Sequence, residues 1–285
     1  MTLMAETSSL QPHAADDPAT IPCRLCGASA SGLFQNVVLN KYPVSYFRCA
    51  ECDLIQTEQP DWLDEAYATA ICASDTGAIN RNVLTARLTS ALARVLGLTP
   101  ASRCLDFGGG HGVFVRMMRD RGFRFEWFDA YAKNLFAIGF DGRAADQCDL
   151  ITSFEVLEHL VDVSGELNAI FAGRPAAVLV STMLHRGHEP GWWYYSPHTG
   201  QHVAFYSRQT MNHIAARFGY SAAGSRAYTL FIRNDAPFAR WRRRWAEGLV
   251  QRSKGNSTNR WVKAMEWLLP NLPALTESDC QAVQK

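Results

Sequence analysis

The chain has 285 residues, of which 47% are apolar and 19% charged, and its formal net charge is +1. These proportions are those of a globular protein with one core and some appendages, and the near-zero charge gives no global attraction to nucleic acid. No apolar run reaches the ~20 residues of a membrane-spanning helix, and the N-terminus lacks a basic segment followed by an apolar one. We therefore expect a cytoplasmic protein without a membrane span.

The first part of the chain divides into a tail and a metal-binding module. Residues 1–20 mix Ser, Ala, Asp and Pro without periodicity, which predicts a disordered tail. Residues 21–60 hold two C-x-x-C pairs on either side of apparent strands at 33–39 and 44–47. Four thiolates offered from two tight turns are the ligand set of a tetrahedral zinc site. The expected zinc ligands are Cys23, Cys26, Cys49 and Cys52.

The eight cysteines of the chain favour metal binding over disulfides in a reducing compartment. Iron or a redox dithiol remains the alternative for the two pairs. A closed four-thiolate site leaves no position open for a substrate, so we expect the zinc to be structural.

Residues 61–98 are expected to form a helical linker or lid. Leu84, Leu88 and Leu92 recur on one helical face, and we expect this helix to pack on the edge of a sheet that follows. The loop at 73–77 is placed to fold over a cofactor. Tyr67 is either a half-buried packing residue or an aromatic of the active site.

Residues 103–119 organise the rest of the chain. An apolar run meets three consecutive glycines and resumes with helical periodicity, which predicts a strand, a tight loop and a helix N-terminus. Such a turn suits a nucleotide, because glycine lets the backbone approach a ligand. A dinucleotide fingerprint needs a third glycine where Val113 stands. The run Asp106-x-Gly108-x-Gly110 instead resembles the first motif of class I S-adenosylmethionine (SAM) methyltransferases.

Two further strand ends agree with this resemblance. Residues 123–129 alternate into a strand that ends in an acid, where doubly wound folds place the carboxylate that binds ribose hydroxyls. Residues 149–162 run from a strand into a helix and closely resemble the E-V-L-E-H segment of the same enzymes. The expected SAM-binding residues are Asp106, Phe107, Gly108, Gly110, Asp129, Ala130, Phe154 and Glu155.

The alternation of strands and helices predicts an α/β fold, with a Rossmann-like class I methyltransferase sheet over residues 99–234. The sheet is expected to be mostly parallel, with helices on both faces and a terminal hairpin. A third strand–helix unit near 136–143 is poorly marked. The expected strands are 103–107, 124–129, 149–154, 176–182, 220–226 and 228–233, and the expected helices are 111–121, 156–172 and 208–218.

Residues 184–207 form a loop that is long for a compact domain, as substrate lids and binding loops often are. Four adjacent aromatic residues suit a sugar ring or a flat metabolite, and several histidines titrate near neutral pH. The alternative is that the aromatics cap the core and the histidines are surface residues. The expected substrate-binding residues are Trp192, Trp193, Tyr194, Tyr195, His198, Gln201 and Tyr67.

Taken together, the cysteine pairs, the glycine turn, the E-V-L-E-H segment and residues 200–207 resemble zinc-containing SAM methyltransferases related to nucleotide-sugar C-methyltransferases. The resemblance covers residues 22–234 and implies catalytic histidines at His202 and His159. Gln201 and Gly200 differ from the acid and the histidine that the family has there. Because methyl transfer to a protonated acceptor needs a base near neutral pKa, we expect His202 to be the base and His159 to orient it or the substrate.

Residues 235–285 are predicted to be a basic helical extension, with tryptophans interleaved among arginines. Such a helix can bind phosphates and bases, lie on an anionic membrane, or dock on the body of the protein.

The sequence thus predicts a SAM-dependent methyltransferase of a small molecule, a nucleotide-linked sugar or a related secondary metabolite. Two alternatives remain open at this stage. One is an RNA methyltransferase with a zinc module, and the other is a SAM-binding protein without catalysis.

Overall fold

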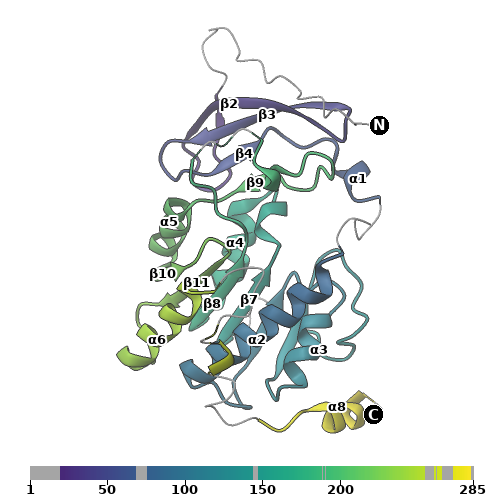
Figure 1. Cartoon of the computed structure of the whole chain (residues 1–285), viewed down its shortest axis with the longest axis vertical. Helices are drawn as coiled ribbons and strands as arrows, with labels where there is room; N and C mark the ends of the chain where they lie inside the picture. Colours follow the sequence, from purple (N-terminus) through teal and green to yellow (C-terminus); the bar gives the residue numbers. More distant parts are fainter. Residues whose placement is uncertain are drawn as a thin grey trace, which may run out of the picture.

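The computed structural model describes residues 20–68, 76–143, 147–187, 189, 191–253, 260, 262–264 and 272–283. The predicted tail before Thr20, most of the loop at 73–77, and much of the segment after residue 253 lie outside the described residues. Figure 1 shows two sheets, with the smaller N-terminal sheet lying across one end of a larger sheet that carries helices. None of the helices in the described ranges is long and apolar enough to cross a membrane.

The larger sheet has the strand order β10-β11-β8-β7-β5-β6. Four strands at one side run parallel, and β11 and β10 close the other side antiparallel as a hairpin. This is the mostly parallel α/β sheet with a terminal hairpin that the sequence predicts. The strands are β5 (Cys104–Phe107), β6 (Phe125–Phe128), β7 (Leu150–Phe154), β8 (Ala177–Ser181), β10 (Tyr220–Gly224) and β11 (Tyr228–Arg233).

The helices cover both faces of this sheet, because alternate strand residues point to opposite sides. Val178 and Val180 of β8 pack toward α4 (Val163–Ala172) and α5 (Arg208–Phe218). Leu179 packs on the opposite face, in a core with three other helices. These are α2 (Ala78–Leu96), α3 (Val113–Arg119) and α6 (Arg240–Gln251). The expected edge position of α2 is wrong, since α2 packs between α3 and α6 and its Leu88 and Leu92 belong to the core on this face.

Two predicted elements differ in the structure. The single helix expected at 156–172 is instead a 3-10 turn, η1 (Leu157–His159), followed by α4. The break falls at Asp162, whose carboxylate accepts the N–H of Gly165 at 2.9 Å and so starts a new helix. The third unit near 136–143 is reduced, among the described residues, to one bridge between Trp127 and Asp141.

The smaller sheet has the order β1-β2-β3-β4-β9. Its last strand comes from the long loop after β8 and pairs with β4 through Ile55 and Phe205. The N-terminal strands and the loop that carries His202 are therefore parts of one sheet. The elements are β1 (Thr20–Pro22), β2 (Ser29–Val38), β3 (Tyr42–Cys49), β4 (Ile55–Thr57) and β9 (Ala204–Phe205), with α1 (Leu63–Ala66) and η2 (Trp193–Tyr195) beside them.

The basic helix α6 docks on the body of the protein. Arg242 donates to the carbonyl oxygen of Val95 at 2.9 Å, and Arg243 donates to that of Arg233 at 2.8 Å. Trp241 and Trp245 remain 57% and 53% exposed. Basic character does not hold throughout the extension, because α8 (Thr276–Val283) begins with acidic residues.

Candidate functional site

The glycine turn lies between β5 and α3, as its sequence predicts. The N–H groups of Gly108 and Gly109 donate to the carbonyl oxygen of Phe128 at 2.8 and 3.0 Å, which fixes the turn to the end of β6. Gly108 has φ +73°, and a Cβ there would lie 2.5 Å from Val156. Glycine is required at this position because the segment after β7 packs directly on the turn.

Asp106 lies beneath this turn. Its carboxyl is 3% exposed and accepts a hydrogen bond from the hydroxyl of Thr152 at 2.7 Å. Burial raises the pKa of Asp106 to about 7, although the hydrogen bond from Thr152 acts in the opposite direction. The buried side chain of Phe107 follows it. A Cβ at Gly109 would lie 3.0 Å from a carboxyl oxygen of Asp106, so this side chain lies directly against the turn.

Asp129 closes the other side of the turn. One of its oxygens accepts the N–H of Gly110 at 2.8 Å, and the other accepts the N–H groups of Tyr131 and Ala132 at 2.8 Å each. Ala130 beside it is exposed. The half-buried carboxylate is thus held by three backbone N–H groups, and its binding of ribose hydroxyls stays a prediction.

Phe154 and Glu155 follow the end of β7. The ring of Phe154 packs edge-on against Phe114, with centroids 5.0 Å apart. Glu155 has φ +54°, and its carboxylate accepts the hydroxyl of Ser181 at 2.6 Å. Burial and the charge of Glu158 raise the pKa of Glu155 to about 7. The left-handed backbone at Glu155 turns the chain from β7 into η1.

The structure brings the two predicted histidines together. The rings of His159 and His202 have centroids 4.9 Å apart at an interplanar angle of 82°. Nδ1 of His202 lies 2.7 Å from the carbonyl oxygen of Tyr194. Because a carbonyl can only accept, we assign the ring proton to Nδ1, which leaves the Nε2 lone pair of a neutral ring available.

His159 has a matching arrangement. Its Nδ1 lies 3.1 Å from the carbonyl oxygen of Gln201 and 2.9 Å from the hydroxyl of Tyr67. Gln201 itself donates through its amide to the carbonyl oxygen of Ala66 at 2.9 Å. Burial, with a smaller contribution from His202, lowers the pKa of His159 to about 3, so this imidazole is neutral at physiological pH.

Glu158 completes the group, and the sequence analysis missed it. Its side chain is 0% exposed, and Oε1 accepts the hydroxyl of Tyr194 at 2.5 Å. Its other oxygen, Oε2, has no hydrogen-bond partner among the described residues. One donor atom from each of Glu158, His159 and His202 lies within 4.8 Å of the others. The signal was the second acid of E-V-L-E-H, directly before the histidine.

The aromatic run of the long loop is mostly inside the protein. Trp192, Tyr194 and Tyr195 are 7%, 3% and 2% exposed and pack beneath the N-terminal sheet with Phe205. They are buried because β9 pulls the loop into that sheet. Trp193 is 69% exposed, and His198, further along the loop, is exposed as well. Substrate binding by this run stays a prediction, and Trp193 is its exposed side chain.

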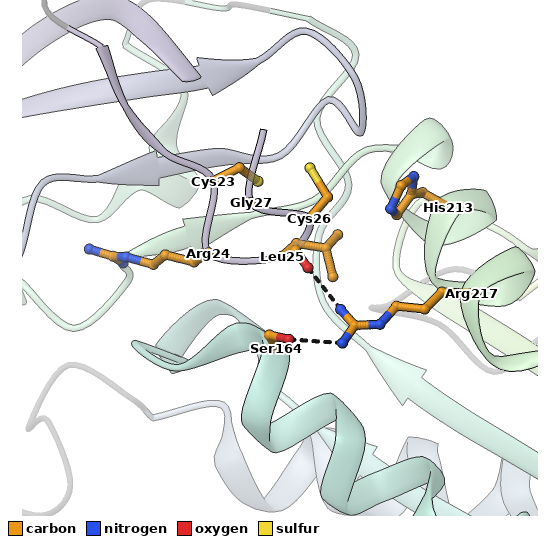
Figure 2. Close-up of a pocket in the computed structure, with 8 residues that line it drawn as sticks. All are labelled: Cys23, Arg24, Leu25, Cys26, Gly27, Ser164, His213 and Arg217. Atoms are coloured by element: carbon orange, nitrogen blue, oxygen red, sulfur yellow. Dashed lines mark hydrogen bonds between the residues drawn. The ribbon is translucent and has the colours of Figure 1, made fainter. Parts of the chain in front are cut away.

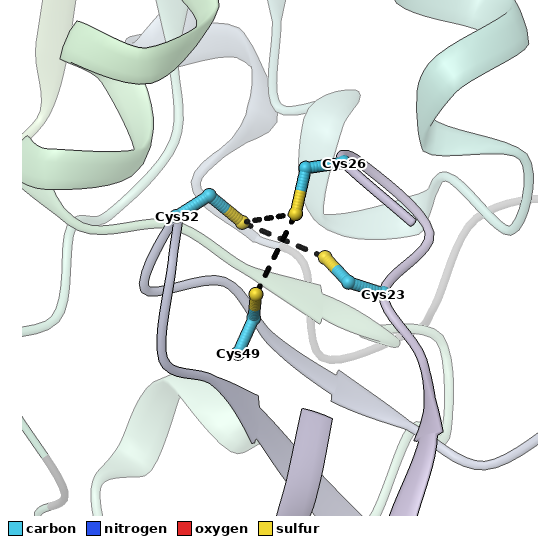
Figure 3. A group of neighbouring side chains, drawn as sticks. All are labelled: Cys23, Cys26, Cys49 and Cys52. Carbon is cyan, nitrogen blue, oxygen red and sulfur yellow. Dashed lines mark hydrogen bonds between the residues drawn. The ribbon is translucent and has the colours of Figure 1, made fainter. Parts of the chain in front are cut away.

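The four predicted zinc ligands converge, as Figure 3 shows. The sulfur atoms of Cys23 and Cys52 are 3.5 Å apart, and that of Cys26 lies 3.6 Å from those of Cys49 and Cys52. In each turn the N–H of the residue after the second cysteine donates to the carbonyl of the first cysteine. A tetrahedral zinc with ~2.3 Å bonds places its sulfurs ~3.8 Å apart, so the donor set fits such an ion.

A hollow of about 520 Å³ lies beside this cluster, away from the glycine turn. Figure 2 shows Arg217 of α5 crossing it, where the guanidinium donates to the carbonyl oxygen of Leu25 at 2.8 Å and to Ser164 at 2.9 Å. His185 is buried and pairs with the carbonyl of Asp53, the residue after Cys52, at 3.1 Å. These contacts fix the cysteine turns to the larger sheet. The neighbouring His188 lies outside the described residues.

The chain was compared with families of known proteins, with curated sequences and with solved structures. The family described as Methyltransferase domain matches residues 80–223, half of the chain. No curated protein sequence matches the chain. Among solved structures, it is similar to magnesium protoporphyrin IX methyltransferase from Synechocystis PCC 6803 with bound SAM, at 14% identity and TM-score 0.39, over 61% of this chain and 90% of that chain. It is also similar to 1,6-didemethyltoxoflavin-N1-methyltransferase from Burkholderia thailandensis, at 15% identity and TM-score 0.41, over 66% and 93%.

Proposed function

Because this chain belongs to the methyltransferase-domain family, it is a SAM-dependent methyltransferase, and we propose that its acceptor is a small molecule, a nucleotide-linked sugar or a related secondary metabolite. The proposal rests mainly on the contacts of the short segment 155–159. Val156 packs on Gly108 of the glycine turn, and His159 follows three residues later with its N–H bonded to the carbonyl of Val156 at 3.0 Å. The predicted cofactor site and the histidine pair therefore flank one another.

In this proposal the glycine turn and the end of β7 hold the cofactor. Gly108 and Gly110 let the backbone approach SAM, and Asp129 receives the ribose hydroxyls while it holds the turn. Phe107, Ala130, Phe154 and Glu155 line the same strand ends. Asp106 supports the turn from beneath.

His202 is the proposed general base. As the acceptor atom attacks the methyl carbon in line, its proton passes to Nε2 of His202, the C–S bond breaks, and its electron pair stays on sulfur to give S-adenosylhomocysteine. The bond from Nδ1 to Tyr194 holds the ring in the tautomer that this step needs. His159, neutral and packed against it, orients the base.

A sugar is supported by two exposed aromatic rings, one of which, Tyr67, is bonded to His159, and by the resemblance of residues 200–207 to nucleotide-sugar enzymes. Trp193 and Tyr67 are 69% and 42% exposed, and such rings pack well against sugar rings. His198 and Gln201 supply polar groups on the same loop. An RNA acceptor has less support, because Arg242 and Arg243 of the basic helix are engaged with backbone carbonyls.

We also propose a structural zinc at Cys23, Cys26, Cys49 and Cys52, since four converging thiolates leave no open ligand position. The proposed organisation is a tail at 1–20, a zinc module at 21–60 completed by β9, a helical linker at 61–98, a methyltransferase domain at 99–234 and a helical extension at 235–285.

The test is isothermal calorimetry of the zinc-loaded protein with S-adenosylhomocysteine, repeated in the presence of nucleotide diphosphate-sugars. We expect S-adenosylhomocysteine to bind, and to bind more tightly when a nucleotide-sugar is present. Failure to bind would overturn the assignment of the glycine turn. RNA affinity that falls steeply with salt would support an RNA acceptor. Tight binding without methylated product from any metabolite pool would favour a non-catalytic role.

A further inference from the structure

We propose that Glu158, His159 and His202 form a second metal site, which binds a divalent cation of the first transition row at the acceptor side of the active site. The donors come from η1 and from the loop before β9, and one atom from each lies within 4.8 Å of the others. The site is separate from the cysteine cluster and differs from it in chemistry. Imidazole and carboxylate suit ions such as Mn²⁺, Fe²⁺ or Zn²⁺, whereas four thiolates select zinc.

Each donor is oriented by a hydrogen bond of the kind that metal ligands need. Nδ1 of His202 faces the carbonyl oxygen of Tyr194 at 2.7 Å. Nδ1 of His159 faces the carbonyl oxygen of Gln201 at 3.1 Å and the hydroxyl of Tyr67 at 2.9 Å, and we assign the proton to Nδ1 because the carbonyl can only accept. A histidine that gives its N–H to a carbonyl presents the lone pair of its other nitrogen, which is the usual arrangement of a metal-bound imidazole. Both rings are thus prepared as ligands by the backbone.

The carboxylate supplies an independent observation. Glu158 is 0% exposed, and only its Oε1 has a partner, the hydroxyl of Tyr194. Oε2 has none among the residues described, although leaving a buried carboxylate oxygen unpaired is costly. A cation between the two rings and Oε2 satisfies this oxygen and the charge of the buried carboxylate together.

Tyr194 contacts two of the three donors, Glu158 and His202. Its hydroxyl positions Glu158, and its backbone carbonyl positions His202. Tyr194 is 3% exposed and is held in the core beneath the N-terminal sheet. The aromatic run therefore acts on the site from behind, as a support for the ligands.

This inference goes beyond the proposed function and competes with one part of it. The Nε2 lone pair of His202 cannot hold a proton and a cation at the same time. With the cation bound, an acceptor hydroxyl that coordinates it loses its proton to water more readily, and the resulting oxygen attacks the methyl carbon. The methyl transfer and the SAM site are the same in both cases, so the two proposals can fail separately.

The experiment is a titration of the zinc-loaded full chain with Mn²⁺, in which free Mn²⁺ is followed by its electron paramagnetic resonance signal. We expect one Mn²⁺ per chain beyond the thiolate-bound zinc. The isosteric change Glu158→Gln keeps an oxygen for Tyr194 but removes the charge, and it should weaken Mn²⁺ binding at least ~10-fold, as should His202→Gln. Glu166→Gln, which removes a carboxylate of α4 outside the site, is the matched control and should bind as the wild type does.

Calorimetry with S-adenosylhomocysteine on the same samples shows whether each variant is folded and whether the SAM site is present. If the wild type binds S-adenosylhomocysteine but does not bind Mn²⁺, the cation site is overturned and the histidine base is left in place. Equal Mn²⁺ binding by wild type and by both folded variants would place the ion elsewhere. Failure of the wild type to bind S-adenosylhomocysteine would instead count against the proposed function.

Discussion

The cysteine cluster and the Glu158–His159–His202 group are the two sets of side chains proposed to hold a metal ion, yet they are built in opposite ways. The cysteines come from two short turns of one module, and their sulfurs converge to 3.5–3.6 Å. The second group joins a 3-10 turn of the larger sheet to a loop that belongs to the smaller one. The first arrangement lies within one module, whereas the second combines residues of two sheets.

The largest expected effect is the loss of the cysteine site. Cys49→Ser removes one of four thiolates, so we expect loss of zinc and of the N-terminal sheet, with a fall of several kcal/mol in the free energy of unfolding. Zinc content and denaturant unfolding measure this. Cys280→Ser, at an exposed cysteine of α8, is the control and should change neither. A Cys49→Ser protein with unchanged zinc and stability would show that the cluster is not the proposed structural site.

Substitutions in the Glu158–His159–His202 group should lower activity without changing the fold. His202→Gln removes the proposed base, or a cation ligand, and we expect the turnover number to fall ~10²- to 10⁴-fold. The affinity for S-adenosylhomocysteine should stay the same, because the glycine turn is untouched. Steady-state kinetics and calorimetry check the two parts. Unchanged turnover would remove His202 from the mechanism under both proposals.

Asp106 is a buried acid outside this group, and burial raises its pKa to about 7 although the hydroxyl of Thr152 donates to it. Between its ordinary pKa of 3.8 and about 7, the unfolded chain releases this proton while the folded protein keeps it. The contribution of Asp106 to stability is therefore lost as the pH rises through this window. The substitution Asp106→Asn should abolish this pH-dependent loss of folding stability, because an amide does not titrate.

The measurement for Asp106 is the urea midpoint of wild type and variant at pH 4.5 and pH 8. The variant should gain stability relative to the wild type between the two values, and the subtraction cancels the titration of all other groups. An equal difference at both pH values would show that Asp106 does not titrate in this window in the folded protein.

The smallest effect is expected at Tyr194, whose hydroxyl touches Glu158 but no other member of the group. Tyr194→Phe keeps the ring and the backbone carbonyl that holds His202. We expect Mn²⁺ affinity to fall ~10- to 100-fold, with zinc content unchanged. A parallel titration of Tyr195→Phe, at a neighbouring buried tyrosine, serves as the control. If both variants bind Mn²⁺ as the wild type does, Tyr194 does not position a cation ligand.

The sequence predicted those parts of the site whose chemistry is local. The cysteine pairs could be predicted because two ligands lie three residues apart in one turn. The glycine turn could be predicted because Gly108 and Gly110 adopt backbone conformations that few other residues adopt. The parallel strands followed from their apolar runs. The third unit was poorly marked in sequence and proved nearly absent among the described residues.

The remaining features depend on packing between distant segments. Nothing around Trp192 to Tyr195 indicates that β9 joins the N-terminal sheet and buries the run, so exposed and buried aromatics could not be distinguished. Glu158 was missed for the same reason, since its role depends on Tyr194. The division of 156–172 into η1 and α4 came from a single capping carboxylate at Asp162.

The most direct test of the account is a crystal structure of the zinc-loaded protein with S-adenosylhomocysteine bound. We expect the ligand to lie against Gly108 and Gly110, with its ribose at Asp129 and its sulfur directed toward the side of the site where His159 and His202 meet. A ligand bound elsewhere, or bound at the glycine turn with its sulfur directed away from the two histidines, would contradict the placement of methyl transfer at this group.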